Sequence, residues 1–173
     1  VAASLIMTST RMLVRSIASH DVPVAEVMRR TNQLLQAEAC GGQFVTANYV
    51  RIDPQRLVME VCTAGHEPTL VYRPREDRFL TAQSRALPLG ITPDAAYATE
   101  TIPLEPGDLV VLYTDGVNEA MNTEREQFGL ARLQETIRAA CPDGIEAVMR
   151  TVLTAVDWHS AGMPRHDDTT IVV

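Results

Sequence analysis

Apolar residues recur at close to helical spacing through the first part of the chain. Residues 2–19 contain no Pro or Gly, and their apolar positions fall on one face of a helix. The pattern breaks at Asp21 and Pro23, because Asp can cap free backbone N–H groups and Pro suits the first position of a new helix. We therefore predict a second helix over residues 23–39, ended by two glycines.

From residue 44 the apolar period shortens to that of strands. Two runs, 44–52 and 57–63, flank a turn that contains Pro, which is typical of a hairpin. The segments TLVYR at 69–73 and RFLTA at 78–82 predict further strands, and another short strand is expected at 97–104. The middle of the chain is therefore predicted to form antiparallel sheet.

The most continuous apolar run is LVVLYT at 109–114, which leads directly into Asp115 and Gly116. Such a run predicts a buried strand, and Asp-Gly at its end predicts an abrupt turn. A carboxylate at the rim of a core is costly unless it is paired, hydrogen-bonded or bound to a cation. On its own, however, an Asp-Gly pair is most often only a turn.

The rest of the chain predicts two helices, at 130–140 and 145–159, and a closing strand that follows Asp167 and Asp168. An Asp-Asp pair before a strand is also commonly a solvated turn. Helices, a run of antiparallel strands, more helices and a last strand form the pattern of an α+β domain with helices covering the sheets. The chain lacks alternating βαβ units and Gly-rich phosphate motifs, which excludes a doubly wound nucleotide-binding fold.

Composition adds limits on function. The 173 residues fit one domain, and the net charge of −7, with 15 scattered basic residues that are all Arg, argues against a nucleic-acid surface. No apolar run approaches the ~20 residues of a membrane span and no signal-peptide pattern is present, so we predict a cytoplasmic protein. Cys40, Cys62 and Cys141 lack paired spacing and are predicted to be core residues, not a disulfide or zinc site.

Asp115 and Asp167 would meet if the two strands beside them are neighbours. Carboxylates within about 4–6 Å repel unless a cation lies between them. Oxygen ligands suit Mg²⁺ or Mn²⁺, and a water bound to such a metal is a usable nucleophile near neutral pH. His66 is interpreted as a loop histidine, and His20, His159 and His166 show no ligand spacing. No Ser-His-Asp arrangement can be argued from spacing.

These motifs occur in an order that resembles a known family. The pieces are FVTA at 44–47, AGHEP at 64–68, LPLG at 87–90, EPGD at 105–108, YTDGVNEA at 113–120, FG at 128–129 and DDTT at 167–170. Together they resemble the bacterial PPM-type Ser/Thr phosphatases of the SpoIIE and RsbU group, and the resemblance covers the whole chain.

The resemblance implies an αββα sandwich of two antiparallel sheets with a dinuclear Mn²⁺ or Mg²⁺ site. By the family pattern Asp115, followed by Gly116, and Asp167 would be metal ligands, and Asp168 would be an occasional ligand or would support the other two. The implied reaction is hydrolysis of phosphoserine or phosphothreonine by metal-activated water. The implied partners are a phosphorylated anti-anti-sigma protein of the STAS type, an upstream sensor or regulatory domain, and a second copy that pairs through the first two helices.

The sequence departs from the family pattern at its start. The family's first metal-binding motif, Gly-Asp-x-Ser-Gly-His-Gly, normally precedes a stretch like that beginning at Val1, so we expect 1–173 to be one N-terminally truncated phosphatase domain that holds at most one metal and is nearly inactive alone. One alternative is a non-catalytic module that binds a partner protein. A haloacid-dehalogenase-like hydrolase would need an Asp-x-Asp motif, but Tyr113 stands two residues before Asp115.

Overall fold

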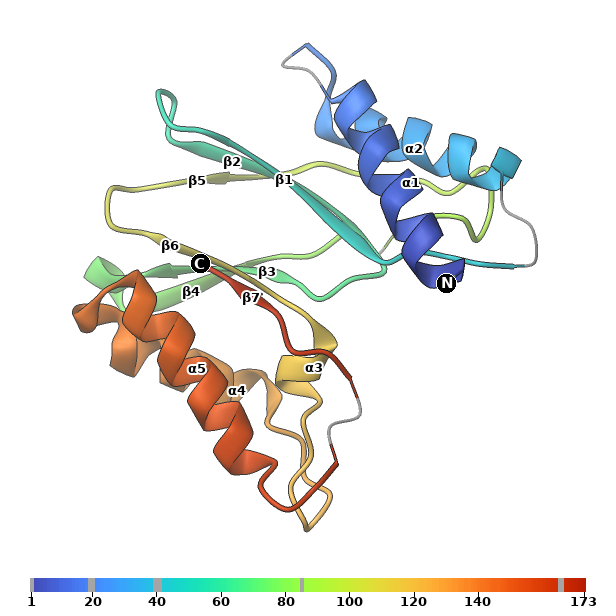
Figure 1. Ribbon diagram of the computed structural model, residues 1–173. Helices are drawn as coiled ribbons and strands as arrows, with labels where there is room; N and C mark the ends of the chain where they lie inside the picture. Colours follow the sequence, from blue (N-terminus) through green and yellow to red (C-terminus); the bar gives the residue numbers. More distant parts are fainter. Residues whose placement is uncertain (1, 19–20, 39–41, 85, 165–166) are drawn as a thin grey trace. The chain divides into compact units, whose positions relative to one another are not determined.

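The computed structural model describes residues 2–18, 21–38, 42–84, 86–164 and 167–173, which contain helices and antiparallel sheets (Figure 1). The chain forms two compact units. The first is made of Val1–His66 and Ala82–Leu104, and the second of Glu67–Thr81 and Glu105–Val173. The predicted α+β class is confirmed.

The first unit contains two helices and a three-stranded sheet. The helices are α1 (Ala2–Ile17) and α2 (Val24–Glu38). The sheet has the order β1-β2-β5, with β1 (Ala47–Asp53), β2 (Val58–Ala64) and β5 (Glu100–Pro103). Both strand pairs are antiparallel, as the sequence predicted. Strands β1 and β5 are shorter at their N-terminal ends than the predicted runs 44–52 and 97–104.

The core of the first unit lies where α2 meets β2. Buried apolar residues from α2, β2 and the connection that precedes β5 form one cluster, which consists of Val24, Met28, Leu35, Cys62, Ala64 and Leu89. Cys62 is therefore a core residue as predicted, and burial raises the pKa of its thiol to about 11. Cys40 and His20 lie outside the described residues.

The second unit contains the second sheet and the remaining helices. The sheet has the order β4-β3-β6-β7, with β3 (Thr69–Arg73), β4 (Arg78–Ala82), β6 (Leu109–Tyr113) and β7 (Ile171–Val172). The helices are α3 (Asp115–Asn118), α4 (Gly129–Ala140) and α5 (Ile145–His159). The predicted helix 145–159 has the same bounds as α5, and the prediction for α4 starts one residue late.

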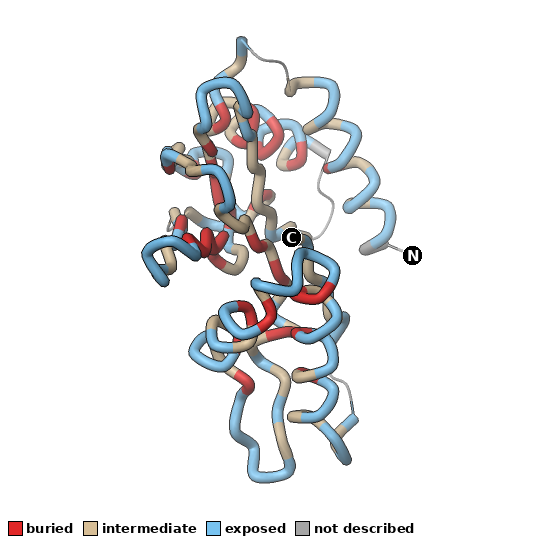
Figure 2. Tube along the Cα trace, turned by 90° about the vertical axis from the view of Figure 1, so that its left-hand side faces the viewer, coloured by how far each residue is buried: buried red, intermediate tan, exposed pale blue. Residues whose placement is uncertain are grey.

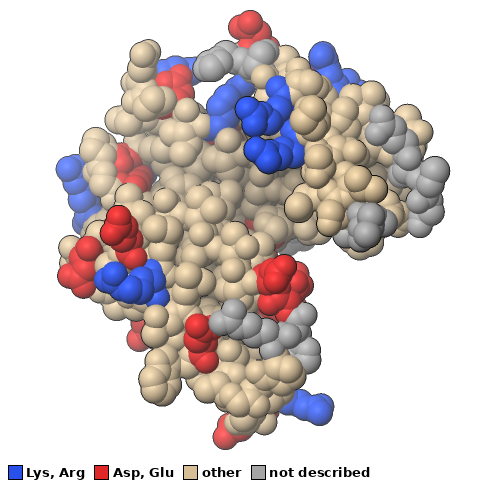
Figure 3. Space-filling model, in the orientation of Figure 1, with Lys and Arg blue, Asp and Glu red and all other residues tan. Residues whose placement is uncertain are grey.

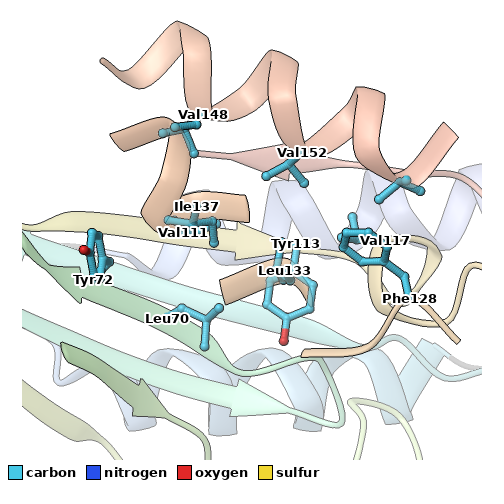
Figure 4. Close-up of a cluster of buried hydrophobic side chains, with 12 residues drawn as sticks. Leu70, Tyr72, Val111, Tyr113, Val117, Phe128, Leu133, Ile137, Val148 and Val152 are labelled. Atoms are coloured by element: carbon cyan, nitrogen blue, oxygen red, sulfur yellow. The ribbon is translucent and has the colours of Figure 1, made fainter. Parts of the chain in front are cut away.

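Strand and helix faces of the second unit share an apolar core. Residues of β3, β6, α3, α4 and α5 contribute to it, among them Leu70, Val111, Val117, Leu133, Ile137, Val148 and Val152 (Figure 4). Among the described residues, buried positions lie mainly in helices and strands, and exposed positions are common in the connections (Figure 2). Cys141 is only half-buried, packed against this core, so the prediction of a core cysteine holds there in part.

A buried ion pair fixes the start of β6 against β3. The guanidinium of Arg73 donates to both carboxylate oxygens of Asp108, with a shortest nitrogen–oxygen distance of 3.0 Å, and it also lies 3.0 Å from Glu105. The side chains of Arg73 and Asp108 are 8% and 3% exposed. The EPGD turn is therefore held by charge pairing inside the fold as well as by its Pro and Gly.

One local prediction was wrong. Asp115 and Gly116 do not form a turn after the central strand; they are the first two residues of the short helix α3. Thr114 stands before this helix with extended backbone, φ −93° and ψ 162°. None of the helices within the described ranges is both long and apolar enough to cross a membrane.

Candidate functional site

The pairing of β6 with β7 joins the two Asp motifs. The strands are antiparallel, with Leu112 opposite Val172 and Tyr113 opposite Ile171. The ladder continues past the strand ends, because the backbone N–H of Thr114 donates to the carbonyl oxygen of Thr170 at 3.1 Å. Segments from distant parts of the sequence thus become neighbours, which is the condition on which the predicted meeting of Asp115 and Asp167 depended.

The side chain of Thr114 strengthens this junction. Its hydroxyl donates to the carbonyl oxygen of Asp168 at 3.0 Å and accepts from the backbone N–H of Thr170 at 3.0 Å. In return, the hydroxyl of Thr169 donates to the carbonyl oxygen of Gly116 at 3.3 Å. Main-chain and hydroxyl hydrogen bonds therefore join the two motifs, and the carboxylate groups of the Asp residues take no part in these bonds.

A cavity of about 200 Å³ opens beside this junction. Asp115 and Asp167 both line it, and so do two carboxylates that the sequence reasoning missed, Glu119 and Asp157. Ala120, Met121, Val156 and Pro164 add an apolar part to the wall. Figure 3 shows a group of acidic side chains over α3, and on the face drawn there the charged side chains occur in separate small groups on a mostly uncharged surface.

The missed carboxylates have different origins. Glu119 follows Asp115 by four residues, so it shares a helix face with Asp115 once α3 is recognised. The four-residue spacing was not recognised as helical because a turn was predicted at Asp115 and Gly116. Asp157 belongs to α5, and only the packing of α5 in the second unit brings it to the cavity. No pattern within α5 separates Asp157 from an ordinary solvated residue.

Asp115 and Asp167 each accept a hydrogen bond from the next residue in the chain. Asp115 Oδ1 accepts from the N–H of Gly116 at 2.8 Å, and Asp167 Oδ1 accepts from the N–H of Asp168 at 2.7 Å. Asp168 itself is not among the residues that line the cavity. Asp168 contacts the junction through its backbone carbonyl, which accepts from the hydroxyl of Thr114.

The described histidines lie elsewhere. His66 is 3.3 Å from the hydroxyl of Thr46, and Nε2 of His159 lies 2.9 Å from the carbonyl oxygen of Glu126, whereas His166 is outside the described residues. Across the described ranges, no group of three or more His, Cys, Asp or Glu side chains is arranged to hold a metal ion. Any cation at the cavity would therefore complete its coordination with water or substrate oxygens in addition to the carboxylates.

A family model for the Stage II sporulation protein E (SpoIIE) family matches residues 1–173. The phosphoserine phosphatase RsbU of Bacillus subtilis (strain 168) is 25% identical over 176 aligned residues, which cover 100% of this chain and 51% of RsbU. The chain thus spans about half the length of that curated relative.

Solved structures show the same fold. The SiaA-PP2C domain of Pseudomonas aeruginosa superposes with a TM-score of 0.86 at 19% identity and covers 99% of this chain and 69% of that one. The phosphatase domain of SpoIIE from Bacillus subtilis, presoaked with manganese, gives a TM-score of 0.67 at 19% identity and covers 94% of this chain and 70% of that one. The chain belongs to the SpoIIE family and has the fold of a PP2C-type phosphatase domain.

Proposed function

We propose that this chain is the phosphatase domain of a regulatory protein and that it hydrolyses phosphoserine or phosphothreonine on a partner protein with the help of a divalent cation. One observation carries the proposal: Asp115 and Asp167, which are 52 positions apart in the sequence, line one cavity. Membership of the SpoIIE family and similarity to the phosphoserine phosphatase RsbU support the reaction class.

The chemistry of the cavity fits a cation. Among the described residues that line it, four are acidic and none is basic. A phosphate ester is an anion, and four carboxylates would repel it unless positive charge lies between them. Oxygen donors of this kind suit Mn²⁺ or Mg²⁺, and the related SpoIIE domain was studied after soaking in manganese. A cation bound by Asp115 and Asp167 would supply Lewis-acid stabilisation of phosphate charge and an acidified water.

The donor set also sets an expectation for the isolated chain. Although four carboxylates line the cavity, no three acidic, histidine or cysteine side chains of the described residues are arranged to hold one metal ion. Two carboxylates alone bind a divalent cation weakly, because water must supply the remaining ligands. We therefore expect the 173-residue polypeptide alone to hold at most one metal and to turn over slowly. Asp168 is proposed to support the site through its backbone, with its side chain at most an occasional ligand.

We infer the partners from the same relatives. The phosphorylated substrate is proposed to be an anti-anti-sigma protein of the STAS type, and an upstream sensor or regulatory domain is proposed to control the phosphatase. The first helix offers a surface for a second copy of the chain, because Leu5, Met7 and Met12 of α1 are 64–66% exposed. Burial of such side chains on association is favourable.

The test is phosphate release from p-nitrophenyl phosphate and from a phosphorylated STAS protein, with and without Mn²⁺. It compares the 173-residue chain, a form extended upstream by the family's first metal-binding motif, and the Asp115→Asn and Asp167→Asn variants of that form. We expect metal-dependent release by the extended form alone. Matched variants at Glu135, an exposed carboxylate of α4, serve as controls.

Failure of the extended form to release phosphate from either substrate at saturating Mn²⁺ would overturn the proposal. If that form nevertheless binds the STAS protein, the domain is a partner-binding module. If the 173-residue chain matches the extended form in rate, the expectation of an incomplete site is wrong while the phosphatase assignment stands.

A further inference from the structure

The short helix α3 is too small to be stable without tertiary contacts. It has only four residues, and one turn of helix gains too few hydrogen bonds to offset the entropy of ordering it. The bonds at its ends include the N–H of Val117 donating to the carbonyl oxygen of Thr114 at 2.9 Å and the N–H of Glu119 donating to that of Asp115 at 2.8 Å. The direction in which Asp115 faces the cavity must therefore be set by contacts outside the helix.

Two contacts outside the helix hold its first part. At the N-terminal end, the hydroxyl of Thr169 donates to the carbonyl oxygen of Gly116 at 3.3 Å. The middle is held by Val117, which is fully buried in the core of the second unit (Figure 4). These contacts hold the first part of the helix. They do not hold its C-terminal end, which is followed by Glu119 and Met121 of the cavity wall.

Glu67 anchors the C-terminal end of α3. Its Oε2 accepts a hydrogen bond of 3.3 Å from Nδ2 of Asn118, the last residue of α3. Within the described part of the chain Asn118 Oδ1 is buried without a partner, so the Glu67 contact fixes the amide orientation: the NH₂ group must face the carboxylate.

The surroundings hold Glu67 itself in place. It is followed by Pro68, which restricts its backbone, and then by β3, in which every residue is buried. The ring of Tyr113, the last residue of β6, lies close by: burial raises the pKa of its hydroxyl, and the charge of Glu67 adds to that effect. Glu67 therefore sits at the end of two central strands, both rigid parts of the core.

We propose that Glu67 is a positioning residue: its hydrogen bond to Asn118 holds the C-terminal end of α3, and through the helix it sets how Asp115 and Glu119 face the cavity. The effect on metal binding and turnover rests on the proposed function. The effect on the order of α3 does not, because it follows from the contacts alone. Glu67 is not among the residues that line the cavity, so we infer that its influence is transmitted through Asn118.

The experiment uses the upstream-extended form defined above with Glu67→Ala, Glu67→Gln and Asn118→Ala, and with Glu135→Ala as the matched control. Glu135 is an exposed carboxylate of α4 in the same unit. Amide hydrogen exchange at Val117 and Glu119 reports the order of α3, and exchange at Val111 of β6 reports the stability of the core. The Mn²⁺ concentration for half-maximal hydrolysis of p-nitrophenyl phosphate reports the site.

We expect Glu67→Ala and Asn118→Ala each to speed exchange at Val117 and Glu119 about tenfold while Val111 stays protected, because one anchoring hydrogen bond is lost. The Mn²⁺ requirement should rise about tenfold, with kcat at saturating Mn²⁺ nearly retained. Glu67→Gln should keep the exchange rates of α3 and the Mn²⁺ requirement close to those of wild type, since its amide oxygen accepts the same hydrogen bond. The Glu67→Ala/Asn118→Ala double variant should be no worse than either single variant.

Three results would overturn the inference. The first is unchanged exchange at α3 in Glu67→Ala, as in Glu135→Ala. The second is equal loss of protection at Val111, which would make Glu67 a general stability residue. The third is a Glu67→Gln variant as impaired as Glu67→Ala, which would assign the effect to charge and not to the hydrogen bond. A wild type without metal-dependent activity would refute the proposed function, and the exchange data would still decide the role of Glu67.

Discussion

A Cβ atom added to Gly116 would lie 2.5 Å from the backbone carbonyl oxygen of Asp168. The glycine of one Asp motif is thus in direct contact with the backbone of the other. Gly116 does not have a left-handed φ, so it is not required for backbone conformation. Within a helix, alanine would be preferred over glycine by about 1 kcal/mol. The glycine is therefore explained by the space that the junction of β6 and β7 allows.

Gly116→Ala should accordingly destabilise the domain despite its gain in helix propensity. The collision is with backbone, which moves only if the whole β7 segment moves, and overpacking of this kind costs about 1–3 kcal/mol. Urea unfolding of the variant measures the loss, and amide exchange at Thr170, whose N–H bonds to Thr114, locates it at the junction. A variant as stable as wild type, with Thr170 still protected, would contradict the prediction and show that the β7 segment can move without loss of stability.

Asp167 and Asp168 are adjacent but should not be equivalent. The side chain of Asp167 lines the cavity, whereas Asp168 contributes a backbone carbonyl that survives substitution of its side chain. In the full-length protein we expect Asp167→Asn to weaken Mn²⁺ binding by about a hundredfold and Asp168→Asn by less than about tenfold. Isothermal titration with Mn²⁺ gives both values. Equal losses in the two variants would make the Asp168 side chain a ligand.

The fold could be predicted well because its elements are strongly patterned. The amphipathic helix α5 and the fully buried strand β3 have the predicted bounds, since α5 follows a helical period after Gly144 and β3 is a short run bounded by Pro68 and Pro74. The edges of β1 and β5 were overestimated, because apolar residues continue into the chain beyond the last strand pairing. Local pattern identifies an element more reliably than it identifies where hydrogen bonding stops.

The candidate site could be predicted only in part. Asp115 and Asp167, which both line the cavity, could be singled out because one follows and the other precedes an apolar run, where a carboxylate needs a partner. Glu119 was missed because propensity rules assign Asp-Gly to a turn, and α3 forms only through tertiary contacts such as buried Val117 and the Glu67–Asn118 hydrogen bond. Asp157 was missed because nothing local distinguishes it; helix packing alone brings it to the cavity.

Loss of the buried ion pair between Arg73 and Asp108 should lower the free energy of unfolding much more than loss of a surface ion pair. Arg73→Met would leave the Asp108 carboxylate, only 3% exposed, without its partner, and breaking a buried pair costs about 3–5 kcal/mol. Arg78 pairs with Glu76 at the surface, with side chains 54% and 43% exposed, and Arg78→Met should cost less than about 1 kcal/mol. Denaturant unfolding of both variants tests this. Similar small losses would mean that Asp108 is rehydrated when Arg73 is removed.

The stability of the first unit should depend on pH through Glu26. Hydrogen bonds from Arg29 and then Arg30 lower the pKa of Glu26 from 4.5 to about 2, with the nearby positive charges adding to the effect. Because the folded pKa lies below the unfolded value, the native state binds fewer protons in this range. The stabilisation from Glu26 is therefore complete above pH 4.5 and is lost as the pH falls from 4.5 toward 2.

The difference in melting temperature between wild type and Glu26→Gln isolates this effect from the other carboxylates. We expect the difference to be constant above about pH 5 and to shrink toward zero as the pH falls to about 2, because a protonated Glu26 and the glutamine of the variant are both neutral. In a background with Arg29→Gln and Arg30→Gln, the same comparison should show little dependence on pH. A difference that is flat across the acid range in the native background would mean that the arginine hydrogen bonds do not persist in solution.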